Sequence, residues 1–480
     1  MLTREEALAI HHAGPDATVE RLCELSRQTE FLRQRVKELE DQLAQNSRNS
    51  SKPPSSDGPR KPSPRSLRPR GERKPGGQKG HPGRTLEMTD HPDHTVVHAV
   101  HECQGCHRSL DDQPLVEAQR RQVFDVPPPA RIEATEHQAQ IKLCPHCGQL
   151  NKAAFPVEVR APVQYGSWIK AIAIYLREYQ LLPSRRTCEL LRDLFGCGLS
   201  EGTLANILEG ASERLKGPVA GIAQAIADAS VANFDETGCP VNGKRHWLHV
   251  ACTAELTHYQ THPKRGSEAT DEIGILPNFT GRAVHDHWKP YFTYACDHGL
   301  CNVHHLRELI FVHEQWGQEW AREMIDCLLE IKRVVDQMRD VGDHLPEPQL
   351  DEFARKYQGI IEKGHAENPI PPPPPGKKKR GRPKKSKARN LLDRLDAYRK
   401  ETLAFMYDFR VPFDNNQAER DGRMAKVQQK ISGTFRSQAG ATAFCRIRSY
   451  VSTARKNAIN AIDAVRALLA GRPFSPPPSG

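Results

Sequence analysis

Three widely separated acidic residues have the setting expected of metal ligands. Asp235 lies in the run VANFDETG and Asp286 in GRAVHDHWKPY, each at the end of a strand-like segment. Glu419 lies in DNNQAERDGRMAKVQQK, where Asp414 or Asn415 begins a helix. Three converging acids can hold two divalent ions roughly 3.5–4 Å apart, one activating a water or a 3′-hydroxyl and the other stabilising the leaving oxygen. Hard oxygen ligands favour Mg²⁺ or Mn²⁺, so we predict a two-ion phosphoryl-transfer centre.

The helix that carries Glu419 also carries a basic stripe. Arg423, Lys426 and Lys430 follow Glu419 at i+4, i+7 and i+11, so they share its helical face. A helix with one acid and several cations on one face can hold a metal ion while it binds DNA phosphates. We therefore predict that these three residues contact DNA.

Neighbouring residues compete for the same roles, but each has another explanation. Glu236 points to the opposite face if its strand continues. Asp297 could replace the second acid but begins a separate turn-like stretch, and Asp414 is favoured as a helix cap. His285 and His287 flank the second acid and are expected to orient the site or to pack beside it.

Two Cys-x-x-Cys pairs predict a structural zinc site. Each tight pair can offer two thiolates from one turn, and two such turns complete the tetrahedral four-sulfur set that zinc favours. Four free thiols in a small domain, or a redox motif, are the alternatives, although a redox motif usually has one pair. The predicted ligands are Cys103, Cys106, Cys144 and Cys147.

A third cysteine motif is weaker. Cys301 and His304 have ligand-like spacing, but two ligands do not make a zinc site. We favour a structural role for them at the start of a helix.

A basic insert predicts contact with the minor groove of DNA. Residues 377–389 hold nine basic residues in thirteen, centred on Arg380-Gly381-Arg382-Pro383. This peptide resembles the AT-hook, in which glycine permits close approach to the groove floor and arginines enter its negative potential. A basic linker without groove preference is the alternative, and either interpretation implies DNA contact.

Composition places these motifs in a chain of separate modules. The 480 residues include 69 Lys and Arg against 59 acids, a net charge of +10, with 37% apolar residues and 37 prolines. Such numbers indicate folded domains diluted by polar connectors. We expect neither a membrane span nor a signal peptide, and read the 13 cysteines as intracellular thiols.

The N-terminal half divides into four predicted regions. Leucines at heptad positions favour a short coiled coil that joins protomers, although a single amphipathic helix fits too. A Ser-, Pro- and Lys/Arg-rich linker cannot bury a core. The predicted boundaries are 1–45 for the coiled coil, 46–90 for the linker, 91–156 for the zinc-binding domain and 162–230 for a helical region.

Within that helical region, residues 184–211 read as helix, glycine-containing turn, helix. Ser200 is a predicted N-cap of the second helix, whose exposed start carries Thr203 and Asn206. This resembles a helix-turn-helix, which would make Thr203 and Asn206 DNA-reading residues. Many helical hairpins look alike, so a packing role stays open.

The order of these elements resembles bacterial transposases of the insertion-sequence 66 family. The resemblance covers nearly the whole chain and rests on NSSKPPSSD, RKPGGQKGHPG, the cysteine pairs, FDETG, HDHW, LCNVHHLREL, KRGRPKK and DNNQAERDGRMAKVQQKISGTFRS. It implies a multidomain α/β chain with a ribonuclease-H-like core over 231–430. It also implies a mostly helical insertion over about 300–410, containing the basic segment 376–390, and C-terminal helices and a tail over 431–480.

The resemblance further implies a DDE triad of Asp235, Asp286 and Glu419, which agrees with the acids chosen from the residues alone. It implies a bacterial cytoplasmic enzyme that binds terminal inverted repeats, frees a 3′-hydroxyl and joins it to target DNA. Expected partners are double-stranded DNA, further copies of the chain and accessory proteins of the same element. The competing hypotheses are a non-catalytic zinc-dependent DNA-binding regulator derived from a transposase, and a nuclease without strand transfer.

Overall fold

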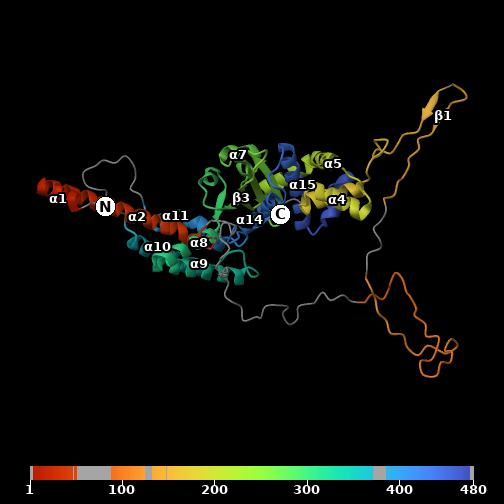
Figure 1. Cartoon of the computed structure of the whole chain (residues 1–480), viewed down its shortest axis with the longest axis horizontal. Helices are drawn as coiled ribbons and strands as arrows, with labels where there is room; N and C mark the ends of the chain where they lie inside the picture. The colour runs from red at the N-terminus through yellow and green to blue at the C-terminus, as the bar shows by residue number, and fades with distance from the viewer. Residues whose placement is uncertain are drawn as a thin grey trace.

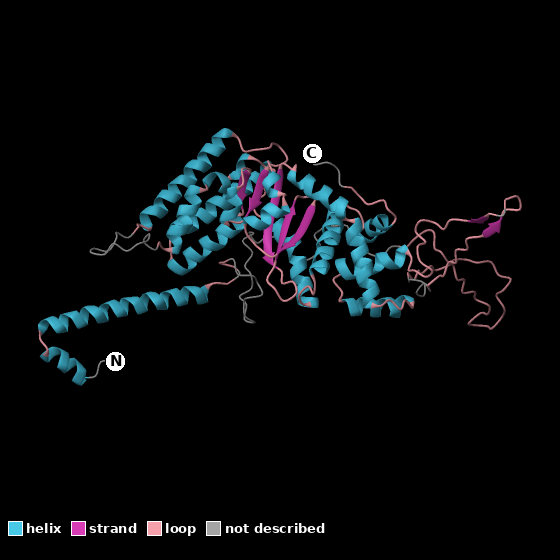
Figure 2. Ribbon diagram, turned by 90° about the horizontal axis from the view of Figure 1, so that it is seen from above, coloured by secondary structure: helices cyan, strands magenta, loops and turns pink. Residues whose placement is uncertain are grey.

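A five-stranded mixed sheet lies in the middle of the chain (Figures 1 and 2). The computed structural model describes residues 4–46, 48–50, 88–124, 132–147, 149–370 and 385–475. The strands of this sheet are β3 (Val231–Gly238), β4 (Trp247–Cys252), β5 (Thr257–His262), β6 (Arg282–His285) and β7 (Asp297–Leu300).

The sheet combines an antiparallel meander with two parallel strands, in the order β5-β4-β3-β6-β7. β3 pairs antiparallel with β4, and β4 with β5, because tight turns join them. β6 pairs parallel with β3, and β7 parallel with β6, after longer connections that contain α7 (Ser267–Ile273) and the short helices η3 (Leu276–Asn278) and η4 (Lys289–Thr293). The parallel strands therefore end at one edge of the sheet.

Helices cover both faces of the sheet. Alternation along β3 places Phe234 in a cluster with Ile222 and Ile226 of α6 (Lys216–Ala227). On the opposite face, Val250 of β4 packs with Ala425 of α14 (Asn416–Ser432) and with α15 (Gln438–Lys456). Asp235 pairs with Val250 across β3 and β4, so it shares the face that α14 covers.

The helices before the sheet and those at the end of the chain share one hydrophobic cluster. Ile174, Leu215 and Tyr450 are among its buried residues. The first group comprises α3 (Ser167–Ile174), the π-helical turn η2 (Tyr175–Tyr179), α5 (Glu201–Arg214) and α6; the second comprises α15 and α16 (Ala461–Leu469). α4 (Ser184–Phe195) packs against α3 and α5 in a neighbouring cluster. Segments more than 200 residues apart thus fold as one layer.

A separate helical core lies between β7 and α14. Trp320, Tyr357 and Leu392 are fully buried in it. Its helices are α8 (Asn302–Trp316), α9 (Glu319–Met338), α10 (Glu347–Glu367), α11 (Lys387–Ala397), α12 (Arg399–Thr402) and α13 (Ala404–Tyr407). The helical content predicted for this stretch is confirmed.

The N-terminal helices α1 (Arg4–His12) and α2 (Pro15–Ala44) stand clear of the sheet (Figure 2). Asp41, near the end of α2, accepts a hydrogen bond of 3.2 Å from the indole of Trp316. Leu22, Leu32 and Leu39 of the predicted heptad are 61%, 60% and 44% exposed. The helix is confirmed, and the coiled coil stays a prediction.

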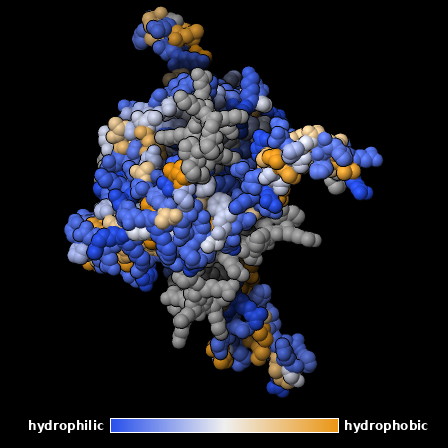
Figure 3. Space-filling model, turned by 90° about the vertical axis from the view of Figure 1, so that its left-hand side faces the viewer, coloured by the Kyte–Doolittle hydropathy of each residue, from blue (hydrophilic) through white to orange (hydrophobic). Residues whose placement is uncertain are grey.

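The face of the molecule shown in Figure 3 is largely hydrophilic, with apolar residues in scattered patches.

The described residues 88–124, 132–147 and 149–160 project from the helical end of the molecule (Figure 1). They contain a two-stranded antiparallel pair of β1 (Ile141–Leu143) and β2 (Leu150–Lys152), whose residues are all exposed. Cys144 and Cys147 lie in the turn between these two strands.

The strand predictions for 231–288 are confirmed, with two differences. β3 runs three residues beyond Asp235, because β4 continues to pair there after β6 has stopped. β7 was missed, since DHGL is short and lacks the β-branched residues that mark strands.

The AT-hook-like residues Arg380 to Pro383 and most of the 46–90 linker lie outside the described residues. No described helix is long and apolar enough to cross a membrane.

Gly281 sets how closely β6 can approach the chain that enters β3. A Cβ atom there would lie 2.4 Å from the carbonyl oxygen of Ala229 and 2.6 Å from that of Ser230. We predict that Gly281→Ala lowers the free energy of unfolding by roughly 1–3 kcal/mol, because rigid backbone must move. Thermal unfolding followed by circular dichroism measures this.

Gly210→Ala in α5 is the matched control. Nothing lies within 4 Å of a Cβ atom at that position. The substitution should be neutral or raise stability by up to ~1 kcal/mol, since alanine favours the helix. Equal melting temperatures for the two variants would contradict the steric role of Gly281.

Candidate active site

Strand register brings the first two acids to one edge of the sheet. Asn233 of β3 is paired with Val284 of β6. Two residues further along, the same register sets Asp235 beside Asp286, which directly follows β6. Asp286 is held there by its own turn, because its Oδ1 accepts a hydrogen bond of 2.9 Å from the amide of Trp288. The pairing of parallel strands therefore places these two carboxylates side by side, which the spacing in the sequence alone could not establish.

The third acid comes from α14, which Asn415 ties to the sheet. The buried side chain of Asn415 accepts a hydrogen bond from the Asn233 amide and donates one to the carbonyl of Phe234, both of 2.8 Å. Its backbone carbonyl accepts from the amide of Glu419 at 3.2 Å, in the first turn of the helix. Asn415 thus connects the strand that carries Asp235 to the helix that carries Glu419. The sequence predicted Asn415 as a possible helix start, but it did not predict these hydrogen bonds to β3.

Asp235 lies near enough to Asp286 and Glu419 for their charges to act on it, although the ligand atoms of these three acids do not all lie within 4.8 Å of one another. Burial, together with the nearby carboxylates of Glu236, Glu419 and Asp286, raises the pKa of Asp235 to about 8. A hydrogen bond from the amide of Glu236 opposes the rise. The protein therefore gathers negative charge where Asp235 ionises with difficulty unless a cation is present. This set of oxygen donors fits divalent ions such as Mg²⁺ or Mn²⁺.

Glu236 lies on the other face of β3, as predicted, and has partners of its own. Its carboxylate accepts hydrogen bonds from the hydroxyl of Tyr291 and from Nε of Arg265, the latter at 2.7 Å. The guanidinium of Arg265 also lies over the rings of Trp247 and Trp288, 4.9 Å and 4.2 Å from their centroids. These contacts give the Glu236 carboxylate partners of its own, although its charge still acts on Asp235.

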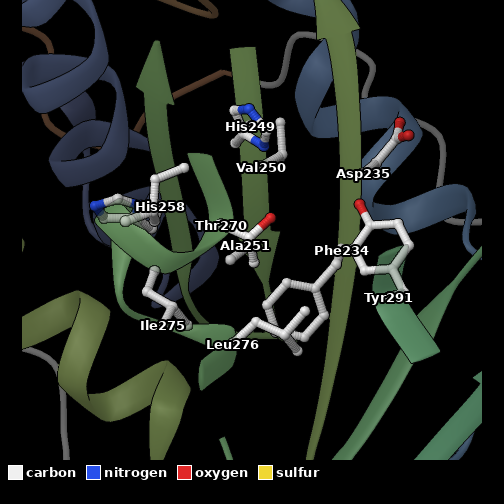
Figure 4. A pocket seen from close by; sticks show the side chains of 11 residues that line it. Phe234, Asp235, His249, Val250, Ala251, His258, Thr270, Ile275, Leu276 and Tyr291 are labelled. Carbon is white, nitrogen blue, oxygen red and sulfur yellow. The ribbon is translucent and has the colours of Figure 1, made fainter. Parts of the chain in front are cut away.

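A small pocket lies behind β3 (Figure 4). Figure 4 shows the Asp235 carboxylate directed away from the apolar side chains of Phe234 and Leu276 that line it. The pocket is mostly apolar and lies beside the cluster on the α6 face. Asp235 lines this pocket but Asp286 and Glu419 do not, so the cavity does not bring the three acids together.

The remaining acids that competed in the sequence have structural roles. Asp297 begins β7 opposite Arg282, at the far end of the parallel strands, and forms an ion pair of 3.0 Å with that arginine. Asp414 accepts a hydrogen bond of 3.0 Å from the amide of Asn416, which is the capping role expected of it.

His285 and His287 pack beside the site, as expected. Nε2 of His285 lies 3.0 Å from Nδ1 of His298, and its ring stacks on Tyr291. The ring of His287 packs edge-on against Tyr398. Burial lowers the pKa of His285 to about 3 and that of His287 to about 4, so both rings are neutral near pH 7.

Cys301 and His304 lie next to Glu419, which sequence spacing did not indicate. Their ligand atoms and a Glu419 oxygen lie within 4.8 Å of one another. Nε2 of His304 is 3.9 Å from Oε1 of Glu419. In the described part of the chain, no other set of three or more His, Cys, Asp or Glu residues is so grouped.

The predicted DNA-contacting residues differ in their surroundings. Arg423 and Lys430 are exposed on α14, whereas Nζ of Lys426 donates a 2.5 Å hydrogen bond to the carbonyl of Gly238. Burial lowers the pKa of Lys426. Lys426 therefore ties α14 to the end of β3, so its ammonium is already engaged within the protein.

The predicted helical pair is confirmed as α4 and α5. The hydroxyl of Ser200 caps α5 by accepting a hydrogen bond of 3.1 Å from the amide of Thr203. Asn206 is exposed and Thr203 half-buried on α5. The DNA-reading role of both residues stays a prediction.

Each cysteine pair forms a tight turn, but the two pairs are not gathered into one four-sulfur group among the described residues. Hydrogen bonds from Cys106 and Gly105 lower the pKa of the Cys103 thiol, and hydrogen bonds from Cys147 and His146 lower that of Cys144. Turns that direct amides at a sulfur favour the thiolate that zinc needs. The shared zinc site stays a prediction.

Comparison with known families adds to this geometry. A family model described as "Transposase IS66 family" matches residues 162–443, from before α3 into α15, and so includes all three acids. A second model, described as "Family of unknown function (DUF6444)", matches residues 5–87. No curated protein matches the sequence.

We predict that Asp235→Asn stabilises the chain at pH 7 when divalent ions are absent. The folded chain keeps the Asp235 proton up to about pH 8, whereas the unfolded chain loses it near the ordinary aspartate pKa of 3.8. The free energy of unfolding therefore falls as pH rises between these values. The partly exposed asparagine avoids this loss, for a gain on the order of 1–3 kcal/mol at pH 7.

Thermal unfolding in a chelator between pH 4 and 8 measures the effect. Glu209→Gln, at an exposed position of α5, is the control and should change little. A wild-type chain whose advantage over Asp235→Asn grows as pH rises would contradict the electrostatic account.

Proposed function

Because the chain belongs to the IS66 transposase family, we propose that it binds the terminal inverted repeats of an insertion sequence and catalyses DNA cleavage and strand transfer. Asp235, Asp286 and Glu419 would hold two divalent ions, Mg²⁺ or Mn²⁺. The observation that carries this proposal is the placement of three carboxylates on β3, after β6 and on α14, where the charges of Glu419 and Asp286 add to burial in raising the pKa of Asp235.

The sheet supports the catalytic assignment. An antiparallel meander followed by two parallel strands, in the order β5-β4-β3-β6-β7, is the arrangement expected of a ribonuclease-H-like core. In open sheets, ligands bind beyond the carboxyl ends of parallel strands. Asp235 lies just after the parallel pairing of β3 with β6 ends, and Asp286 directly follows β6. The third acid then has to arrive from a helix, as Glu419 does.

The reaction needs little covalent chemistry from the protein. When bound, the metal ions would activate the attacking oxygen and stabilise the leaving 3′-oxygen. The residues of the chain orient DNA for in-line attack and keep the three carboxylates in a fixed arrangement. Asn415 fixes the helix that carries Glu419, while the Asp286 turn fixes the second carboxylate.

The DNA path is proposed from charge and exposure. Arg423 and Lys430 extend the face of α14 that starts at Glu419, so they would bind phosphates beside the acids. Thr203 and Asn206 of α5 would read the element end. The AT-hook-like peptide at 380–383 would add minor-groove contact. The ammonium of Lys426 donates to the carbonyl of Gly238, so Lys426 would contribute less directly to DNA binding.

The modules outside 162–443 would organise this activity. The exposed leucines of α2 would pair copies of the chain, so that two element ends meet in one complex. The two cysteine turns would share a structural Zn²⁺ that stiffens an end-binding domain. Accessory proteins of the same element are further expected partners.

We predict that the full chain joins labelled ends of its own element to target DNA when Mg²⁺ is supplied. Asp235→Asn, Asp286→Asn and Glu419→Gln should each lower strand transfer by at least about 10³-fold, because each removes a metal ligand. DNA binding measured by gel shift should persist in all three.

Asp297→Asn is the matched control, since it removes an acid at the opposite end of the same strands. It should keep strand transfer within a few-fold of wild type. An inactive wild type that still binds element ends would favour the non-catalytic regulator. Hydrolysis without joining would favour a simple nuclease.

A further inference from the structure

Cys301 stands at the same level of the sheet as the two strand acids. β6 and β7 pair Val284 with Gly299 and His285 with Leu300. Continued by one residue, that register sets Cys301 beside Asp286, which in turn lies beside Asp235. The amide of Cys301 donates to the carbonyl of His285 at 3.0 Å, which supports this placement. The sulfur therefore belongs to the edge where the acids gather.

The Cys-x-x-His spacing forms a natural chelate at the start of α8. Cys301 is the N-cap and His304 the third helical residue, and side chains at these two positions face each other across the first turn. Glu419 reaches the pair from α14. Two helices and a strand end thus converge on one point, with all ligand atoms within 4.8 Å.

Hydrogen bonding within the protein does not account for this group. Nδ1 of His304 is buried and has no hydrogen-bond partner among the described residues. Its Nε2 lies 3.9 Å from Oε1 of Glu419, which is too far for a hydrogen bond. The sulfur of Cys301 accepts a hydrogen bond of 3.2 Å from the amide of Asn415, as metal-bound thiolates often do. A cation between Nε2 of His304 and Oε1 of Glu419 would give these two atoms a common partner, whereas Nδ1 would need a separate one.

The spacing and chemistry of the donors select the class of ion. Ligand atoms around a tetrahedral zinc ion lie about 3.3–3.8 Å apart, as its bond lengths of roughly 2.0–2.3 Å require. The observed 3.9 Å needs a small inward shift of side chains that are 20% and 29% exposed. One sulfur, one imidazole and one carboxylate favour zinc over magnesium, which prefers oxygen alone. Three protein ligands also leave a fourth position open.

We propose that Cys301, His304 and Glu419 form a binding site for a zinc-class divalent ion, distinct from the four-cysteine site. Binding would deprotonate the Cys301 thiol, and the proton would pass to solvent while sulfur donates its electron pair to the metal. Glu419 belongs to both this set and the proposed magnesium set. Zinc here would therefore withdraw the third carboxylate and inhibit strand transfer, a consequence that rests on the proposed function.

Cobalt binding to the full chain tests the site directly. Co²⁺ substitutes for zinc and gives a near-ultraviolet charge-transfer band for each thiolate that it binds. We expect Cys301→Ala and His304→Gln each to bind about one equivalent less Co²⁺ than wild type. Cys301→Ala should also lose the charge-transfer intensity of one sulfur. Because His304 is partly exposed, His304→Gln should fold normally, so its loss of cobalt binding would not be due to misfolding.

Cys327→Ala is the matched control, since Cys327 is buried in α9 outside the group. It should bind as much Co²⁺ as wild type. Equal cobalt stoichiometry in wild type, Cys301→Ala and His304→Gln would overturn the proposal. If Cys301→Ala binds less Co²⁺ but His304→Gln binds as much as wild type, the three-ligand set would be overturned.

Zinc inhibition tests the consequence. With Mg²⁺ in excess, we expect zinc to inhibit wild-type strand transfer, and His304→Gln to need at least about tenfold more zinc for the same fractional inhibition. Equal zinc sensitivity of the two chains would overturn the competition for Glu419. Absence of strand transfer from every chain would count against the proposed function, while the cobalt stoichiometry would still decide the metal site.

Discussion

Mutual repulsion among three carboxylates is the constraint on which the rest of the structure depends. Asp235 is hard to ionise because it is buried and because Glu236, Glu419 and Asp286 lie near it. Negatively charged carboxylates repel one another, so the surrounding strands and helices have to hold them in place. It does so through strand register for Asp235 and Asp286, and through the Asn415 side chain for the helix of Glu419. The proposed divalent ions would neutralise the charge that this scaffold holds together.

The same constraint explains how a large helical segment can lie between the second and third acids. The amide of Asn302, at the start of α8, donates to the carbonyl of Phe413 at 3.1 Å, and Cys301 accepts from the amide of Asn415. The two ends of the segment therefore meet beside the acids. The helices α8 to α13 bury their own core, so they can fold without displacing the site. α15 closes the opposite side by joining the sheet to the helices that precede it.

Much of this arrangement could be predicted from local sequence, and the remainder depends on contacts between distant residues. Strands 231–238 and 257–262 and the capped start of α5 follow from alternation and from Ser200. The acids could be chosen by their strand-end and helix-start settings. Asn415 could be seen as a cap but not as a clamp, since its partners lie more than 180 residues away. Lys426 matched a helical stripe, yet its partner is a strand carbonyl that helical periodicity does not reveal.

Equilibrium binding of Mn²⁺, followed by the electron paramagnetic resonance of the free ion, tests the central claim most directly. Manganese prefers oxygen ligands, so cysteine-rich sites compete weakly for it. The account predicts that the wild-type chain binds about two more Mn²⁺ ions than a chain carrying both Asp235→Asn and Glu419→Gln. Equal binding by the two chains would contradict the claim that Asp235, Asp286 and Glu419 form a two-ion centre.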